Sequence, residues 1–256
     1  MKESTTTSPS GRHLGHHHGL LSPDSTQYNR DKEDKMRHIH HNMTLIALLN
    51  EKPLTRWLTS IVVLLPKDIG RPKIHRLRII NTYKSEYNLV LKYFLPKQGM
   101  HKAKSNQWLG NNQTGGRKNF CAIETGTIDQ LIIETHRLTK YPLCLHQDNA
   151  MGCYDRIIRS HAILSSRKFG IPDNICKVYS IAYDLMHFKP QINNNISMTS
   201  YSSTAELICH EADQGVGNSG TNWTFISILI IAVVEDVSQG CIINLPRRNT
   251  KWQKHM

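Results

Sequence analysis

The stretch from Tyr141 to Ser160 constrains the fold of this chain more than any other. It reads Tyr-Pro-Leu-Cys-Leu-His-Gln-Asp-Asn-Ala-Met-Gly-Cys-Tyr-Asp-Arg-Ile-Ile-Arg-Ser. A short apolar segment follows the proline, an acidic position comes next, and the remainder is typical of a turn that leads into a helix. This order predicts a strand that presents an acidic side chain at its end. Because side chains alternate along a strand, we expect Asp148 and Asn149 to point to opposite faces.

This stretch resembles the first catalytic motif of reverse transcriptases, most of all the branch found in non-LTR retroelements. In that motif, Asp-x-x-x-Cys-Tyr-Asp-Arg-Ile, the first Asp binds the two Mg²⁺ ions that promote attack of the primer 3′-hydroxyl. Here Asn149 stands in the place of the expected Asp, and the acid is one position earlier, at Asp148. Mg²⁺ requires charged oxygen ligands in tight geometry, and a shift of one residue turns a side chain to the opposite face. The resemblance therefore implies a catalytic position at Asn149 and a metal site that binds Mg²⁺ poorly, with Asp148 as the candidate Mg²⁺ ligand.

Tyr154 follows the metal-ligand position by five residues, where the family places an aromatic ring beneath the sugar of the nucleotide. By this resemblance Tyr154 would exclude a 2′-hydroxyl by steric clash and so select deoxynucleotides. The alternative is a partly buried ring at the start of a helix. We expect Asp155 to cap that helix, from Arg156 to Phe169.

A second motif begins at Gln214 and reads Gln-Gly-Val-Gly-Asn-Ser-Gly, with Trp223 shortly after it. It resembles the family pattern Gln-Gly-Ser-Gly-x-Ser-Pro-x-x-Trp, in which the Gln-Gly turn packs against the nascent base pair; Val216 and Gly220 depart from the pattern. Glycine lets a backbone approach a base closely, and Gln can hydrogen-bond a ribose or a base edge. The resemblance implies that Gln214 and Gly215 bind nucleotide. By itself, such a loop is typical of the entry to a helix.

A hairpin is predicted further upstream. The residues from Ser60 to Leu65 are apolar and β-branched, Pro66 to Pro72 form a turn rich in Pro and Gly, and His75 to Asn81 form a second strand. Two strands joined by a basic loop can lie over a phosphate chain.

Positive charge is concentrated around this hairpin. Lys and Arg outnumber Asp and Glu by 14 to three between Glu51 and Lys118, against 32 to 20 in the whole chain. The segment also resembles the fingers of the same enzymes. The alternative is that these charges simply face solvent. The resemblance implies that Arg forks and Lys ammonium groups grip the incoming triphosphate, the candidates being Lys67, Lys73, Arg76 and Arg78. It also implies that Gly116 and Arg117 contact the template.

The remaining helices are predicted from apolar periodicity. Helical spacing runs from Met43 to Leu58, and an amphipathic helix is expected from Tyr83 to Leu95, followed by a flexible loop over 96–115. The stripe of Ile128, Leu131, Ile132, Thr135 and Leu138 is expected to belong to the core. After a break at Gly170, a helix is expected from Asn174 to Phe188, and a buried helix from Thr221 to Val234.

Composition bounds the rest. Residues 1–42 are polar and rich in His, Ser and Thr, which predicts a disordered tail. The six cysteines are scattered along the chain. This spacing predicts reduced intracellular thiols and neither a disulfide framework nor a zinc site. The longest apolar run, Phe225 to Val234, is about half the length of a membrane-spanning helix, so we expect no membrane partner. A basic chain with a pI near 9.5 favours a polyanion partner, most simply nucleic acid.

These observations together predict an α+β fold that resembles a partial right-hand polymerase. We expect a tail over 1–42, a fingers-like region over 43–140, an incomplete palm over 141–245 and a basic tail over 246–256, without a thumb. The chain contains no Asp-Asp pair after Gln214. The resemblance therefore implies an RNA-directed DNA polymerase, with RNA template and DNA primer as partners, in a truncated and inactive form. The alternative is a non-catalytic basic protein that binds RNA or DNA.

Overall fold

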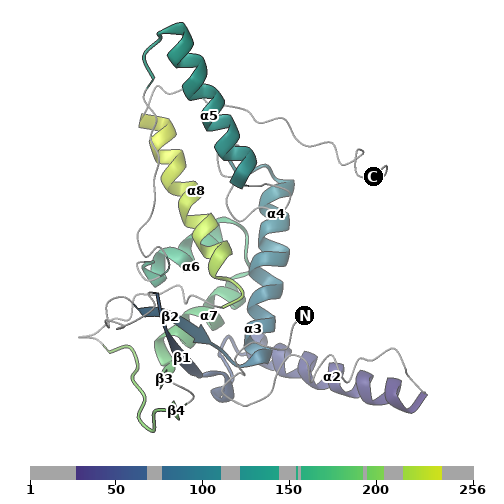
Figure 1. Ribbon diagram of the computed structural model, residues 1–256. Coiled ribbons are helices and arrows are strands. Elements are labelled where there is room, and N and C mark those ends of the chain that lie inside the picture. The colour runs from purple at the N-terminus through teal and green to yellow at the C-terminus, as the bar shows by residue number, and fades with distance from the viewer. Residues whose placement is uncertain are drawn as a thin grey trace.

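The computed structural model describes residues 27–67, 77–110, 122–143, 154, 157–192, 195–204 and 216–237 (Figure 1). In these ranges the chain forms several helices and one small mixed sheet. The fold is therefore α+β, as the sequence predicts. Figure 1 shows the sheet at one end of the molecule and helix α5 at the other.

The sheet contains the predicted hairpin. Strand β1 (Thr59–Pro66) pairs antiparallel with β2 (Leu77–Thr82). A third strand, β3 (His187–Ile192), pairs parallel with β1 and antiparallel with the two-residue strand β4 (Asn195–Ile196), which gives the order β2-β1-β3-β4. The sequence predicted the hairpin but not β3, because it extended the preceding helix to Phe188. That residue is instead buried in β3.

A continuous helical segment follows β2. It consists of α3 (Ser85–Lys92), a π-helical stretch η3 (Tyr93–Gly99) and α4 (Met100–Ser105). The expected loop over 96–115 is wrong for residues 96–105. Proline lacks an N–H and crowds the preceding turn, and the wider π turn accommodates Pro96 without ending the helix. Close packing also holds the segment, because a Cβ on Gly99 would lie 2.6 Å from Cδ1 of Ile171.

Helix α2 (Gln27–Leu49) begins well before the position that the sequence predicted. The expected disorder over 1–42 is therefore wrong for residues 27–42, whereas residues 1–26 lie outside the described ranges. The segment contains several good helix formers and neither Pro nor Gly. After Leu49 the chain turns through a short 3₁₀ helix, η1 (Thr55–Trp57), which buries the Trp57 ring.

Helix α5 (Ala122–Thr139) was predicted as a helix, but its apolar stripe is not core. Leu131 is 61% exposed and Leu138 is 76% exposed. Figure 1 shows α5 projecting beyond the sheet and α7, so no described part of those elements covers the stripe. Periodicity revealed the helix, but burial depends on a neighbour that periodicity does not specify.

Three helices complete the described fold: α6 (Arg159–Lys168), α7 (Asp173–Leu185) and α8 (Ser219–Val237). The expected cap at Asp155 is wrong, because α6 begins after Ile158 without a side-chain cap. Gly170 ends α6 with a φ of +75°, a conformation that glycine adopts without strain.

Helix α8 is buried only over its first half. Phe225 is fully buried, whereas Val233 is 64% exposed, so the expected buried helix is confirmed in part. Trp57, Tyr87, Tyr179 and Phe225 lie in one main core that joins α3, α7 and α8. Within the described ranges, no helix is both long enough and apolar enough to cross a membrane.

Candidate functional site

The described ranges include part of the predicted site. Lys67, Arg78 and Tyr154 lie within them. The other predicted positions lie outside the described residues: Lys73, Arg76, Gly116, Arg117, Asp148, Asn149, Gln214 and Gly215. The residues next to several of these positions are described, and they show which elements meet there.

Lys67 and Arg78 lie at the same end of the β1–β2 hairpin. In the register of the two strands, Leu65 is opposite Arg78 and Pro66 is opposite Leu77. Lys67 directly follows Pro66, and both charged side chains are exposed. The hairpin thus presents an ammonium and a guanidinium at neighbouring positions, two groups that bind phosphate oxygens.

Tyr154 is half-buried. Its carbonyl accepts a hydrogen bond from the N–H of Ile157 at 3.5 Å. Ile157 is buried with Ala162 of α6, and Trp223 of α8 packs against this pair. Ile157 therefore links the backbone of Tyr154 to the cluster on which Trp223 packs.

The entry to α8 is held against α3. The N–H of Gly217 donates to Oδ1 of Asn88 at 2.8 Å. A Cβ on Gly217 would lie 2.1 Å from Cγ of Lys92, so only glycine fits there without displacing that side chain. The second motif, which the sequence identified through its glycines, thus packs on the helix that follows the basic hairpin. The sequence analysis did not identify Asn88 or Lys92, and nothing in their local pattern marks them.

Behind this contact lies a buried polar cluster, which we call the tyrosine–amide cluster: Tyr179, Tyr183, Asn218 and Asn222. The amide Nδ2 of Asn218 donates to the Tyr179 hydroxyl at 2.5 Å, and Nδ2 of Asn222 donates to the same oxygen. Two donors occupy both lone pairs of that oxygen, so its proton is donated to the Tyr183 hydroxyl, 2.6 Å away. Asn218 and Asn222 are almost completely buried.

Burial sets the ionisation of this cluster. It raises the pKa of Tyr179 well above the ordinary tyrosine value, and the neighbouring Tyr183 raises it further. Tyr87, which stacks on Trp57, has a raised pKa for the same reason, mainly its burial. The cluster therefore stays neutral and serves to fix α7 against α8. The sequence analysis did not identify this cluster; its only sequence signal is the pair of Asn residues four apart, Asn218 just before α8 and Asn222 in its first turn.

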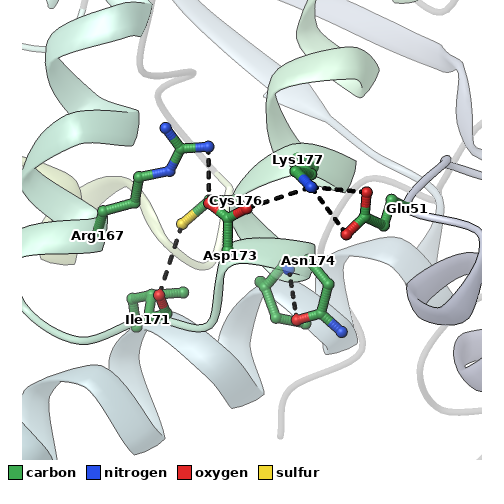
Figure 2. A network of polar contacts seen from close by, with 8 residues as sticks. Glu51, Arg167, Ile171, Asp173, Asn174, Cys176 and Lys177 are labelled. Carbon is green, nitrogen blue, oxygen red and sulfur yellow. Dashed lines mark hydrogen bonds and ion pairs between the residues drawn. The ribbon is translucent and has the colours of Figure 1, made fainter.

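A second polar network holds α6, α7 and the end of α2 together (Figure 2). Asp173 forms two ion pairs: its Oδ1 lies 2.7 Å from Nη2 of Arg167, and its Oδ2 lies 3.3 Å from Nζ of Lys177. Lys177 also contacts Glu51 at 2.8 Å, and these hydrogen bonds, first to Glu51 and then to Asp173, raise its pKa. All four side chains are substantially exposed, so each pair contributes little to stability. Their role is to orient the helices.

The ligand set that the sequence predicts does not fit a pair of Mg²⁺ ions. It consists of one carboxylate, Asp148, and one neutral amide, Asn149, both outside the described residues. Mg²⁺ sites of this kind use several charged oxygens. In the described ranges, no group of three or more His, Cys, Asp or Glu side chains is arranged to hold a metal ion. Cys176 is the one cysteine in those ranges and is a free, buried thiol.

Comparison with known proteins gives no family assignment. No protein-family model matches the sequence, and no curated protein matches it. Function is therefore argued from the motifs and from the contacts that bring them together.

Proposed function

We propose that this chain is the nucleotide-cradling part of a reverse-transcriptase-like right hand, with fingers and part of a palm, which binds nucleic acid and triphosphate but does not polymerise. The substrate class is deoxynucleoside triphosphate, and the partners are an RNA template and a DNA primer. The single observation that carries the proposal is the contact between Gly217 and Asn88. It holds Gly217, the fourth residue of the motif that begins at Gln214, against the helix that begins three residues after the basic hairpin ends.

Each group in this arrangement has a chemical role in the proposal. Lys67 and Arg78 are exposed at one hairpin end, where they would neutralise triphosphate oxygens. The turn that precedes Gly217 would lie against the base. The backbone of Tyr154 is bonded to Ile157, on which Trp223 packs, and by resemblance to the family the Tyr154 ring would lie beneath the sugar. The tyrosine–amide cluster fixes the entry to α8.

The absence of polymerisation follows from Asn149. An amide oxygen carries no net charge, so it stabilises a bound Mg²⁺ far less than a carboxylate does. When bound, the metal pair would activate the primer hydroxyl and stabilise the leaving pyrophosphate. This chain's own residues therefore support binding and orientation of the nucleotide.

Triphosphate binding tests the proposal. A fluorescent deoxynucleoside triphosphate is expected to bind the full chain, and Lys67→Ala and Arg78→Ala are each expected to weaken binding about tenfold, the loss typical of one charge-assisted phosphate contact. Lys52→Ala removes a lysine elsewhere on the surface and should leave binding unchanged. Asn149→Asp should make binding dependent on Mg²⁺. Equal affinity in all the alanine variants would contradict the proposal.

The second candidate function is a non-catalytic protein that binds RNA or DNA, and the amide at Asn149 is the observation that favours it. It predicts salt-dependent binding of single-stranded RNA with no triphosphate binding and no effect of Mg²⁺. Primer extension on an RNA template by the unaltered chain, lost in Asp148→Ala, would overturn both this candidate and the proposed lack of polymerisation.

A further inference from the structure

In the segment from Ser85 to Gly110, the exposed side chains include several basic residues and no acidic residue. Its one acidic residue is Glu86, whose side chain is 5% exposed. Oε1 of Glu86 accepts a hydrogen bond from Nη2 of Arg56 at 2.6 Å. The solvent-facing side carries a set of basic residues that we call the basic stripe: Lys97, His101, Lys102 and Lys104. A surface of this kind attracts a polyanion.

Two amines of the basic stripe are held in place. Nζ of Lys97 lies 5.2 Å from the centre of the Tyr93 ring, and Nε2 of Gln98 donates to the hydroxyl of that ring at 2.7 Å. Nζ of Lys102 donates to the carbonyl of Gly170 at 3.3 Å. Ammonium groups held in this way lose less side-chain entropy when they meet a phosphate.

One acid on a neighbouring helix already has basic partners. Asp173, at the start of α7, is already engaged by Arg167 and Lys177 (Figure 2). Lys168 at the end of α6 is exposed two residues before Gly170, the residue that Lys102 contacts.

An anchored aromatic ring follows the basic stripe. Trp108 is 41% exposed, and its ring makes an edge-to-face contact with the ring of Phe169, with ring centres 6.2 Å apart. Phe169 in turn stacks on Phe225 of the core at 4.3 Å. The backbone N–H of Trp108 donates to the backbone carbonyl of Ala103 at 2.9 Å, which keeps residue 108 next to the end of α4. A large aromatic ring that packs against a core residue and stays partly exposed can stack on a base.

We propose that single-stranded nucleic acid lies along the basic stripe, with its phosphates on Lys97, Lys102 and Lys104 and one base stacked on Trp108. This inference rests on the proposed function and identifies the surface that takes the unpaired strand. The combination of lysines and a stacking ring selects a single strand, because the bases of a duplex are already stacked on one another. An acidic protein could contact the lysines of the basic stripe but has no base to stack on Trp108.

The test measures binding of a fluorescent oligouridylate to the full chain over a range of salt concentrations. For the variant Lys97→Gln/Lys104→Gln, the slope of log affinity against log salt is expected to fall by about 1.4, since each single-strand phosphate contact contributes about 0.7. The variant Lys52→Gln/Lys140→Gln removes the same charge elsewhere and should keep the slope. Trp108→Leu should weaken binding about tenfold at constant slope, whereas Trp108→Phe should retain most of the affinity.

The results separate this inference from the proposed function. If oligouridylate binds and the stripe and control variants share one slope, the stripe is not the binding surface, whatever the triphosphate result. If oligouridylate does not bind, the inference is also overturned, while triphosphate binding through Lys67 and Arg78 remains a separate measurement. Stronger binding of duplex RNA than of the single strand would contradict the role of Trp108. Unchanged circular dichroism shows that the variants are folded.

Discussion

The backbone N–H of Gly217 donates a hydrogen bond to Oδ1 of Asn88 at 2.8 Å, although 129 residues separate the two in the sequence. This contact joins the start of α8 to α3, and the side chain of Lys92 fills the space beside Gly217. Gly217 at the start of α8 is therefore positioned by the helix that follows the basic hairpin.

Replacement of Gly217 by Ala should destabilise the protein. The new Cβ would lie 2.1 Å from Cγ of Lys92, so the side chain or the backbone must move. We expect the free energy of unfolding to fall by about 1–3 kcal/mol, as for other overpacked sites. Gly220→Ala is the matched control, because nothing lies within 4 Å of its Cβ position and Ala favours the helix. Urea unfolding measures both, and Lys92→Ala should restore much of the stability of Gly217→Ala.

Removal of the single Tyr179 hydroxyl should lower the stability of the protein markedly. Tyr179→Phe leaves the amide donors of Asn218 and Asn222 buried without an acceptor. Each buried donor without a partner costs about 1–3 kcal/mol, so the loss should exceed that of an ordinary hydrogen bond. Tyr93→Phe removes an exposed hydroxyl that receives one bond from Gln98 and should change stability little. Equal melting temperatures of the two variants would contradict the role given to Tyr179.

The pair of Arg56 and Glu86 should matter because one partner is buried. The Glu86 side chain is 5% exposed, so Arg56→Ala leaves a buried carboxylate without its cation. Breaking a buried pair costs about 3–5 kcal/mol, and the partial exposure of Arg56 lowers this to about 2 kcal/mol. Arg137→Ala, which breaks an exposed pair with Glu134, should cost less than about 0.5 kcal/mol. Thermal or urea unfolding of the two variants compares them directly.

Stability should fall in alkali in a way that depends on Cys176. Burial raises the pKa of this thiol to about 11 from its ordinary 9.0. Below pH 9 the thiol is protonated in both the folded and the unfolded chain, so it adds no pH dependence. As pH rises from 9.0 to about 11, the unfolded chain loses the proton while the folded chain keeps it, which lowers the free energy of unfolding. The total effect is on the order of 2 kcal/mol.

The control for this effect is Cys176→Ala. It lowers stability at neutral pH through lost packing, but it should make the decline in stability between pH 9.0 and about 11 shallower. Above pH 10, Tyr87 and Tyr179 continue the decline, because their pKa values are raised as well. Urea unfolding at a series of pH values measures the slope, and an unchanged slope in Cys176→Ala would contradict the raised pKa of Cys176.

Local pattern predicted the elements whose signal is contained in a few residues. The β-branched run that ends at Pro66 forms β1, and the stripe of Tyr87, Val90 and Leu91 is buried in α3. The glycine at 170 ends α6. In each of these, the residue type and its spacing act through the backbone of the same segment, so no distant partner is needed.

Predictions failed where a distant segment decides the outcome. The helix through Pro96 continues because Gly99 packs closely on Ile171 and Phe225. The stripe of α5 is exposed because the described sheet and α7 lie away from it. Strand β3 exists through its pairing with β1, more than 100 residues earlier in the chain.

The sequence by itself determined the α+β class, the basic hairpin and the positions of most helices, and it places Asn149 next to Asp148 in the candidate motif. Only the tertiary structure decided that Asn88 and Lys92 hold Gly217, that Tyr179 joins α7 to α8, and that Trp108 is fixed by Phe169 beside the basic stripe. The physical reason is the range of the interactions. Propensity and periodicity act within a few residues, whereas hydrogen bonds and packing between segments depend on which parts of the chain meet after folding.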